Sequence, residues 1–223
     1  MRDAKFHGPP LAVSKDAGQF YCEHVYFAAQ IEAALPTSSV CRNSAGEVLV
    51  GFLHVPPDRL TTAGSTSMGR RQGRRWTRAL VVQALCGWDP ELEIQLAEQP
   101  RRVLLTGFGN WGVVIDNPSG AFVATRVRTH KLLPRSVQWF SHVLPVSDAA
   151  VDGGPASIQQ AIRACAPHVV ISLGVATQRA GYSVEVSATD GGFDSHTGSH
   201  IEALPPRTTL PDNWALAKVL GLA

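Results

Sequence analysis

The sequence predicts a three-layer α/β/α protein with a central mixed, mostly parallel sheet and helices on both faces. Three observations lead to this fold class. Apolar runs of strand length alternate with segments whose apolar residues recur at helical spacing. Some of the strand-like runs, such as 168–174, are apolar at almost every position, as is typical of strands covered on both sides. Glycine, proline, serine and asparagine gather between the runs and indicate turns.

The first part of the chain predicts two strands and two helices. A strand over 10–13 leads to a helix over about 20–35, in which apolar residues recur at helical spacing. A second strand over 47–55 stops at a proline pair, which cannot continue the hydrogen bonding of a sheet. A helix over 70–86 carries an arginine-rich face, which we interpret as solvated rather than phosphate-binding, and Gly87 is its expected C-cap.

The second part of the chain begins after a predicted connector over 88–101, which contains a short helical stretch. A strand runs directly into a glycine-rich loop, and an Asn-Pro-Ser sequence then opens a helix, because proline is tolerated at a first helical position. The pattern continues with strands and helices in alternation, except for two successive strands. In order, the predicted elements are strand 102–108, helix from 117, strand 136–144, helix 156–165, strand 168–174, strand 182–188 and helix 212–220.

Composition limits the classes of function. With 223 residues, 44% hydrophobic and 17% charged, the chain can bury one sizeable core, and we expect a single domain over 1–223. A net charge of +2 is too small to favour nucleic acid as a partner, and the apolar runs are too short to span a membrane. Four cysteines without metal-type spacing, and a start that does not look like a signal peptide, predict a cytoplasmic protein with reduced thiols.

Cys22 is the first candidate for chemistry. It lies in the first turn of the predicted helix over 20–35, directly after a bend that contains Gly18. Unpaired backbone N–H groups and the positive end of the helix dipole favour a thiolate there, which is the form that attacks a carbonyl carbon. A small buried cysteine that only packs is the alternative interpretation of this position.

A cysteine nucleophile needs a base, and the base needs a group that orients it. Of the eight histidines, His54 is the one at the end of an apolar strand, whereas His142 and His168 suit structural positions. Glu185 lies in the middle of an apolar strand, where an unpaired carboxylate is costly to bury. An outward-facing Glu185 remains the alternative. Together Cys22, His54 and Glu185 predict a Cys–His–Glu set assembled from separate strand ends.

Five short segments carry a resemblance to a known family. They read TGFGNWG with NPS at 106–112 and 117–119, VLPV at 143–146, GVATQR with Glu185 at 174–185, DAGQFYCE at 16–23 and GFLHVP at 51–56. They resemble, in the same order, the motifs TGFxPFGG…NPS, VLPV, GLAPGR…ER, SAGxYLCN and GFxHVP of the pyroglutamyl peptidase I family (pyrrolidone-carboxylate peptidases).

The order of these segments differs from that of the family. The cysteine and histidine motifs come last in the family but first here, so the chain resembles a circularly permuted member with a phosphorylase/hydrolase-like fold. Residues 1–87 are then equivalent to the family's C-terminal part, 88–101 to a linker, and 102–223 to its N-terminal part. Such an exchange is physically reasonable when the original termini lie close together on the surface.

The resemblance implies hydrolysis of the amide bond after an N-terminal pyroglutamyl residue, with no metal or cofactor. Cys22 would be the nucleophile, His54 the general base and then acid, and Glu185 the group that orients His54. The lactam ring would lie against Phe108 and Trp111, with the Asn117 side chain and backbone groups near Val175 and Tyr21 binding its polar atoms. Substrates would be small N-terminally blocked peptides, and copies of the chain would associate through exposed apolar surface.

Four departures from the family's motifs favour a second interpretation, a catalytically silent binding or interaction protein on the same scaffold. Trp111 replaces a phenylalanine, Glu23 an asparagine and Val186 an arginine, and Ser195 stands where the family has another arginine near the active site. A carboxylate at Glu23 would oppose a thiolate at Cys22 if it faced the sulfur. A hydrolase or transferase that acts on a different cyclic amide or a nucleoside-like ligand is a third alternative.

Overall fold

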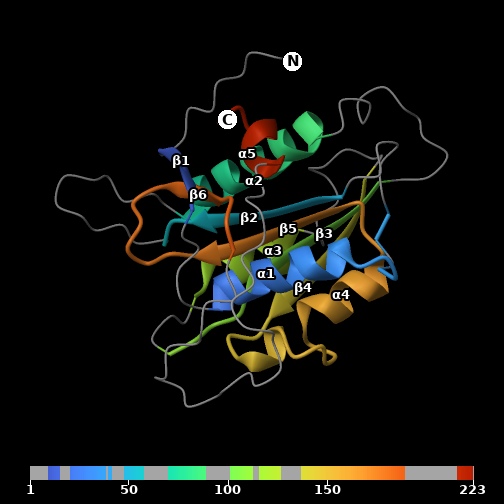
Figure 1. Ribbon diagram of the computed structural model, residues 1–223. Coiled ribbons are helices and arrows are strands. Elements are labelled where there is room, and N and C mark those ends of the chain that lie inside the picture. Colours follow the sequence, from blue (N-terminus) through green and yellow to red (C-terminus); the bar gives the residue numbers. More distant parts are fainter. Residues whose placement is uncertain are drawn as a thin grey trace.

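The computed structural model describes most of the predicted strands and helices. The described residues are 10–15, 21–38, 40–41, 48–57, 70–88, 101–112, 116–126, 137–188 and 215–222. Six strands within them form one sheet, and helices lie on both of its sides (Figure 1). The α/β fold class with a mixed sheet between helical layers is therefore confirmed.

The sheet has the strand order β1-β6-β2-β5-β3-β4. Four of its pairings are parallel, and the pairing of β2 with β6 is antiparallel. The short strands β1 and β6 therefore run opposite to the other four. We call the edge where β2, β3, β4 and β5 end the carboxyl edge, and the edge where they begin the amino edge. The strand bounds are β1 Leu11–Ser14, β2 Leu49–Val55, β3 Arg101–Phe108, β4 Val137–Leu144, β5 Val169–Val175 and β6 Tyr182–Glu185.

Two apolar clusters cover the two faces of the sheet. The helices α1 (Tyr21–Ala34) and α4 (Ile158–Cys165) pack on one face together with the 3-10 helix η3 (Asp148–Ala150). The helices α2 (Arg70–Trp88), α3 (Pro118–Arg126) and α5 (Ala215–Val219) pack on the other face. In Figure 1, α1 and α4 lie below the sheet while α2 and α5 lie above it.

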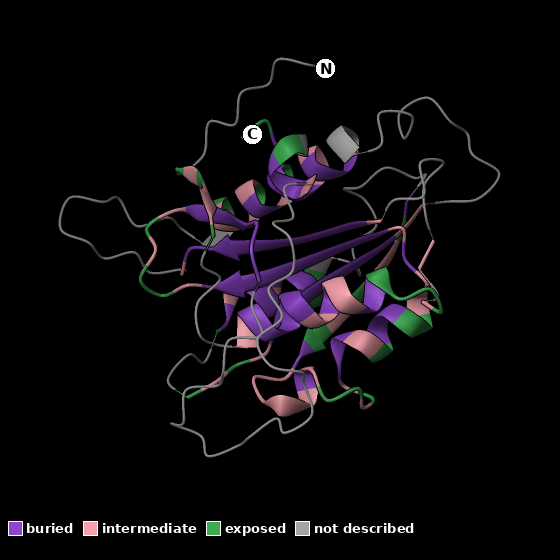
Figure 2. Ribbon diagram, in the orientation of Figure 1, coloured by how far each residue is buried: buried purple, intermediate pink, exposed green. Residues whose placement is uncertain are grey.

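The middle strands are covered on both faces. Every residue of β2 and of β5 is buried, as Figure 2 shows in purple. This double burial explains why both strands are apolar at nearly every position. The edge strand β4 instead exposes several of its residues, because its outer face and its edge meet solvent. Gly51 lets α5 pack directly on β2, since a Cβ added there would stand 2.5 Å from Leu216 Cδ2.

Several element bounds differ from the sequence predictions. The helix predicted over 70–86 continues through Gly87, the expected C-cap, to Trp88. The predicted linker over 88–101 is therefore shorter, because Trp88 belongs to α2 and Arg101 to β3, and 89–100 lie outside the described residues. The strand predicted over 182–188 ends at Glu185. Only the 215–219 part of the predicted last helix is described as helical, and 212–214 lie outside the described residues.

Strands from both parts of the sequence build the same sheet. The first part supplies β1 and β2, and the second part supplies β3 to β6. A circular permutation requires the two parts to share one sheet in this way, although other chain histories would give the same arrangement. None of the helices in the described ranges is long and apolar enough to cross a membrane.

Candidate active site

His54 stands near the carboxyl edge, one residue before the end of β2. It lies beside Gly174 of β5 in the parallel register and beside Ser183 of β6 in the antiparallel register. Side chains alternate between the faces of a strand, so His54 shares a face with Phe52, whose ring centroid lies 5.0 Å from that of the imidazole. This is the face that α1 covers.

Glu185 orients the imidazole of His54. The Nδ1 atom of His54 lies 2.7 Å from Glu185 Oε1, and both side chains are buried, with 3% and 0% of their surface exposed. An ionised carboxylate only accepts hydrogen bonds, so Nδ1 carries the proton and donates it to this contact. The neutral imidazole then keeps the lone pair of Nε2 for accepting a proton from another group.

The sequence placed Glu185 in a buried strand position, and the structure explains how it reaches His54. Glu185 lies beside Phe52 in the register of β2 and β6, two residues away from Ser183, the register partner of His54. Because β6 runs antiparallel to β2, its last residue lies deeper in the sheet than His54. Glu185 is the last residue of β6 and His54 lies one residue before the end of β2, so both come from strand ends as expected, but from two strands that run antiparallel.

Cys22 lies over the strand next to His54. It is the second residue of α1, and its sulfur packs against Gly174, the register partner of His54. A Cβ added to Gly174 would stand 2.8 Å from Cys22 Sγ and 2.7 Å from Phe52 Cζ, so the position has no room for a side chain. The structure thus brings Cys22, His54 and Glu185 to one face at the end of β2 and β5.

The thiol of Cys22 is neutral at rest. Burial raises its pKa to about 12, and the charge of Glu185 adds to this rise. The backbone N–H groups of Val175 and of Cys22 itself, together with the charge of Arg179, lower the pKa by less. The expectation that the helix N-terminus keeps a thiolate is therefore wrong for the resting site, because the loss of hydration outweighs the dipole. The sequence had suggested Glu23 as the opposing carboxylate, whereas Glu185 takes this role.

Arg179 is a member of the site to which the sequence interpretation gave no role. Its Nη1 atom donates to Glu185 Oε1 and to Ser183 Oγ, and it lies 3.5 Å from His54 Nδ1. The guanidinium comes from the turn between β5 and β6, six residues before Glu185. That short separation, inside the motif at 174–185, was the available signal, but the turn that folds Arg179 back onto Glu185 could not be inferred from it.

Tyr21 and Asp148 form a second contact beside the nucleophile. The Tyr21 hydroxyl donates to Asp148 Oδ1 at 3.1 Å, which joins the start of α1 to η3. Burial raises the pKa of Tyr21 to about 12, and the acceptor Asp148 adds to the rise. Asp148 was not predicted as a site residue, because η3 has no strong sequence pattern of its own.

The structure divides the predicted lactam-binding residues between two environments. Phe108 is 3% exposed and belongs to the same apolar cluster as Cys22, whereas Trp111 is half-buried and packs with the cluster on the other face. The side chain of Val175 also faces that other cluster, and its backbone N–H acts on the Cys22 sulfur. Phe108 and Trp111 thus do not belong to one cluster, as two walls of one pocket would.

Most hydrogen-bonding atoms of the Asn117 side chain are already engaged at the start of α3. Its Oδ1 accepts from the backbone N–H and the hydroxyl of Ser119 at 3.1 and 2.8 Å, and its Nδ2 donates to the Gly109 carbonyl at 2.9 Å. These contacts cap the helix and fix the loop that precedes it. A ligand therefore has access to one amide hydrogen of Asn117 at most.

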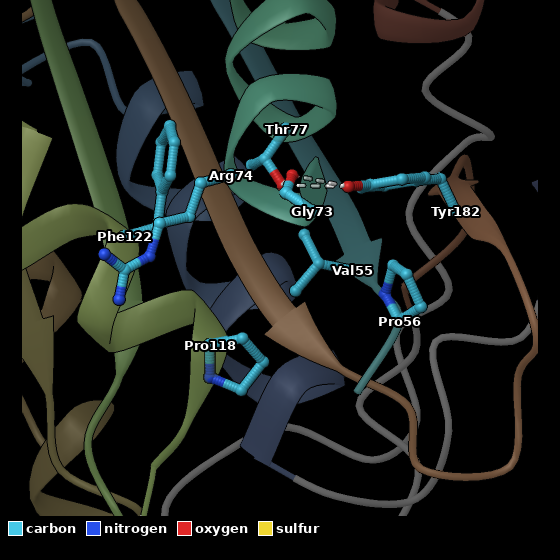
Figure 3. Close-up of a pocket in the computed structure, with 8 residues that line it drawn as sticks. All are labelled: Val55, Pro56, Gly73, Arg74, Thr77, Pro118, Phe122 and Tyr182. Atoms are coloured by element: carbon cyan, nitrogen blue, oxygen red, sulfur yellow. Dashed lines mark hydrogen bonds between the residues drawn. The ribbon is translucent and has the colours of Figure 1, made fainter. Parts of the chain in front are cut away.

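A small hollow lies on the opposite face of the sheet (Figure 3). There the hydroxyls of Thr77 and Tyr182 both donate to the Gly73 carbonyl at 3.0 Å. These polar groups therefore satisfy each other within the packing of α2 on the sheet. The lining residues are Val55, Pro56, Gly73, Arg74, Thr77, Pro118, Phe122 and Tyr182. His54 precedes Val55 and points to the other face, so the hollow is separate from the thiol.

Two of the remaining histidines have structural contacts, as expected. His142 Nε2 lies 3.1 Å from the Ala156 carbonyl, and His168 Nδ1 accepts from the backbone N–H of Arg102 at 3.1 Å. Within the described ranges, no three cysteine, histidine or acidic side chains gather to hold a metal ion. Ser195, where the family has an arginine, lies outside the described residues. Comparison of the chain with models of protein families, with curated proteins and with solved structures finds no match.

Proposed function

We propose that the chain is a cysteine peptidase that hydrolyses the amide bond after an N-terminal pyroglutamyl residue. One observation carries the proposal: Cys22 lies over Gly174 beside His54, and His54 donates from Nδ1 to the buried Glu185 at 2.7 Å. This arrangement supplies a nucleophile, a base with a free Nε2 and a group that orients the base. The motifs at 16–23, 51–56 and 174–185 add the resemblance that suggests the substrate.

The reaction follows from these roles. His54 Nε2 takes the proton of the Cys22 thiol as the sulfur attacks the scissile carbonyl, which forms a tetrahedral intermediate. The intermediate collapses when the C–N bond breaks, and His54 returns the proton to the leaving amine. Water, activated by the same Nε2, then attacks the thioester, releases pyroglutamate and restores the thiol.

If the thiol is neutral at rest, proton transfer from Cys22 to His54 and attack by the sulfur take place together. Burial raises the pKa of Cys22 to about 12, so the proton leaves the sulfur only when His54 accepts it during attack. The backbone N–H groups of Val175 and Cys22 already act on the sulfur. As charge moves from the sulfur to the carbonyl oxygen, N–H groups at this start of α1 would stabilise the oxyanion.

For the substrate we propose small peptides blocked by a pyroglutamyl residue. Tyr21, which is half-buried next to Cys22, offers ring surface that a ligand at the thiol could reach, whereas Phe108 and Asn117 are buried and Trp111 packs with the cluster on the other face. The lactam carries one N–H donor and one carbonyl acceptor, which a few backbone groups can bind. The exposed side chains of Leu35 and Val143 are candidates for contact between copies of the chain.

Release of a fluorescent amine from a pyroglutamyl amide tests the proposal. We expect the wild-type chain to release the amine and the Cys22→Ala variant to lose at least about a thousandfold in rate. Cys165→Ala is the matched control, because it removes a thiol at the end of α4, and it should keep the rate. An inactive wild type, or equal rates in wild type and Cys22→Ala, would overturn the peptidase function.

A binding protein on the same scaffold is the second candidate function. The raised pKa of Cys22 favours it, since a thiol that stays protonated reacts slowly on its own. In this case a pyroglutamyl peptide would bind without being cleaved. Calorimetric titration with the intact peptide, followed by mass spectrometry of the mixture, separates the two functions: binding with no cleavage supports the second candidate, and cleavage supports the first.

A further inference from the structure

Two thiols at the amino edge of the sheet share one guanidinium. Arg102, the second residue of β3, donates from Nη2 to the sulfur of Cys41. Burial raises the pKa of Cys165, the last residue of α4, and the charge of Arg102 lowers it by less. Both cysteines are half-buried, and both are free thiols. One cation therefore acts on two sulfurs that come from segments far apart in the sequence.

Backbone hydrogen bonds hold these three residues in place. The N–H of Cys41 donates to the carbonyl of Pro167 at 2.9 Å, and Pro167 follows Cys165 by two residues. The carbonyl of Arg102 accepts from the N–H of His168 at 2.8 Å, and the N–H of Arg102 donates to His168 Nδ1 at 3.1 Å. The main chain thus brings Cys41 to within one hydrogen bond and two residues of Cys165, next to an arginine whose backbone is fixed.

Two neighbouring thiols beside a cation have the parts that a reversible reaction with a peroxide needs. When a thiol reacts with a peroxide, negative charge develops on the oxygens, and N–H groups of a guanidinium stabilise such charge. The sulfenic acid that forms is converted to a disulfide when a second thiol lies nearby. Cys22 is less suited to this reaction, because burial raises its pKa to about 12 and a thiol that stays protonated reacts slowly.

We propose that Cys41 and Cys165 form a reversible oxidation site, in which hydrogen peroxide oxidises Cys41 and Cys165 then closes a disulfide with it. In the first step the Cys41 sulfur attacks one peroxide oxygen, the O–O bond breaks, and the other oxygen leaves as water with the thiol proton. In the second step the Cys165 sulfur attacks the sulfenic sulfur, the S–O bond breaks, and the hydroxyl leaves as water with the second thiol proton. The two thiols lose two electrons, which reduce one peroxide to two waters.

The contacts of the two thiols set the order in which they react. Arg102 donates directly to the Cys41 sulfur, so its N–H groups are at hand when an oxygen is transferred there. Burial raises the pKa of Cys165, which slows its own reaction with peroxide and leaves it as the thiol that closes the disulfide. This oxidation site lies at the amino edge and is independent of the proposed peptidase function at the carboxyl edge.

Peptide mass spectrometry of the full chain after exposure to hydrogen peroxide tests the proposal. The wild type should yield one peptide pair joined at Cys41 and Cys165 within a single chain, and dithiothreitol should separate it. In Cys165→Ser we expect no bridge, and dimedone should label Cys41, because its sulfenic acid then lacks a second thiol. Arg102→Gln should slow the oxidation of Cys41 by at least about threefold. Arg101→Gln, on the neighbouring residue of β3, is the matched control and should keep the wild-type rate.

A bridge between any other pair of cysteines, or between two chains, overturns the proposal. So does a wild type in which Cys41 is oxidised no faster than Cys22, and so do equal rates in Arg102→Gln and Arg101→Gln. The mapping of the bridge and the rates at Cys41 and Cys22 are read on the wild type, so they remain decisive if a variant does not fold. Because none of these measurements needs turnover, a bridged chain that cleaves no pyroglutamyl amide refutes the peptidase function and supports the oxidation site.

Discussion

Cysteine, histidine and arginine side chains lie at both the carboxyl edge and the amino edge of the sheet, but they make different contacts at each edge. At the carboxyl edge Cys22, His54 and Arg179 surround a buried carboxylate. At the amino edge Cys41 and Cys165 lie near Arg102, whose guanidinium donates to the Cys41 sulfur and acts on the Cys165 thiol. The histidine of that edge, His168, accepts from the Arg102 backbone. The carboxyl edge differs by a buried carboxylate, Glu185, which contacts both His54 and Arg179, and this contact makes it the candidate for catalysis.

Burial separates the two edges as well. At the carboxyl edge His54 and Glu185 are almost fully enclosed, and the sulfur of Cys22 packs against Gly174. Cys22, Cys41 and Cys165 are all half-buried as residues, so the edges differ in their other side chains: Arg102 and His168 at the amino edge are half-buried. Because electrostatic effects are stronger where water is excluded, the same charge changes have larger consequences at the carboxyl edge. The predictions below test this difference from the largest expected effect to the smallest.

The first prediction removes the charge of Glu185. Glu185→Gln keeps the size of the side chain but leaves Arg179 without its counter-charge and deprives His54 of an ionic acceptor. We expect kcat/KM for a pyroglutamyl amide to fall about a thousandfold. Arg102→Gln, the equivalent loss of charge at the amino edge, should change it by no more than about twofold. Equal losses in the two variants would contradict the assignment of catalysis to one edge.

The second prediction fills the space under the Cys22 sulfur. Gly174→Ala places a methyl group 2.8 Å from Sγ and 2.7 Å from Phe52 Cζ, so the start of α1 must shift. We expect the free energy of unfolding in urea to fall by about 2 kcal/mol. In Gly109→Ala the added methyl group lies 3.6 Å from its nearest neighbour, the Leu144 carbonyl, and this control should unfold close to the wild type. A stable Gly174→Ala would show that Cys22 is not packed on β5.

The third prediction concerns alkaline pH. Burial raises the pKa of Cys22 from 9.0 to about 12, so the folded chain holds this proton more tightly than the unfolded chain. The resulting stability is complete below pH 9 and is lost as the pH rises towards 12. By pH 10 the loss from Cys22 should be about 1.4 kcal/mol.

Urea unfolding at a series of pH values measures this loss. The wild type should lose more stability between pH 8 and pH 10 than Cys22→Ala, whose side chain does not titrate. A Cys22→Ala variant with the full wild-type pH dependence would show that the thiol is not buried in the folded state. Tyr21→Phe should remove a further part of the loss, since the pKa of Tyr21 is also raised to about 12.

The fourth and smallest effect belongs to the amino edge. Burial raises the pKa of Cys165, and the charge of Arg102 lowers it by less. Arg102→Gln should therefore reduce the thiolate fraction and slow the alkylation of Cys165 by iodoacetamide at pH 8 by about two- to fivefold. Peptide mass spectrometry reads the rate at each cysteine separately. Arg101→Gln, on the neighbouring residue of β3, is the control, and an unchanged rate in Arg102→Gln would contradict the prediction.

Much of the fold was predictable because its signals are local. The apolar runs of β2 and β5 reflect burial on both faces, and the helical spacing after Gly18 places Cys22 in the first turn of α1. The direction of β6 was not predictable, because the sequence of a four-residue strand does not indicate whether it pairs parallel or antiparallel with its neighbour. The end of α2 was missed because Gly87 is tolerated within the helix that continues to Trp88.

The candidate site was also predictable only in part from the sequence. Cys22, His54 and Glu185 could be chosen from their residue types and strand positions, and the structure brings them to one face. The protonation of Cys22 could not be inferred, because it depends on how deeply the sulfur is buried rather than on the helix terminus alone. The position of Arg179 depends on a turn whose conformation brings it back onto Glu185, a contact that residue spacing does not specify.

The separation of sheet neighbours along the chain has a consequence for synthesis on the ribosome. The strands β1 and β2 are not neighbours in the sheet. β1 pairs with β6, and β2 pairs with β5 and β6, and both of these partners are synthesised more than roughly a hundred residues later. At about 5–20 residues per second, the first two strands wait for several seconds or more without a partner. During that interval their unpaired apolar segments are open to chaperones and to other nascent chains, whereas β3, β4 and β5 are made in succession and can pair early. The residues of the proposed triad therefore come together only after β6 has left the ribosome.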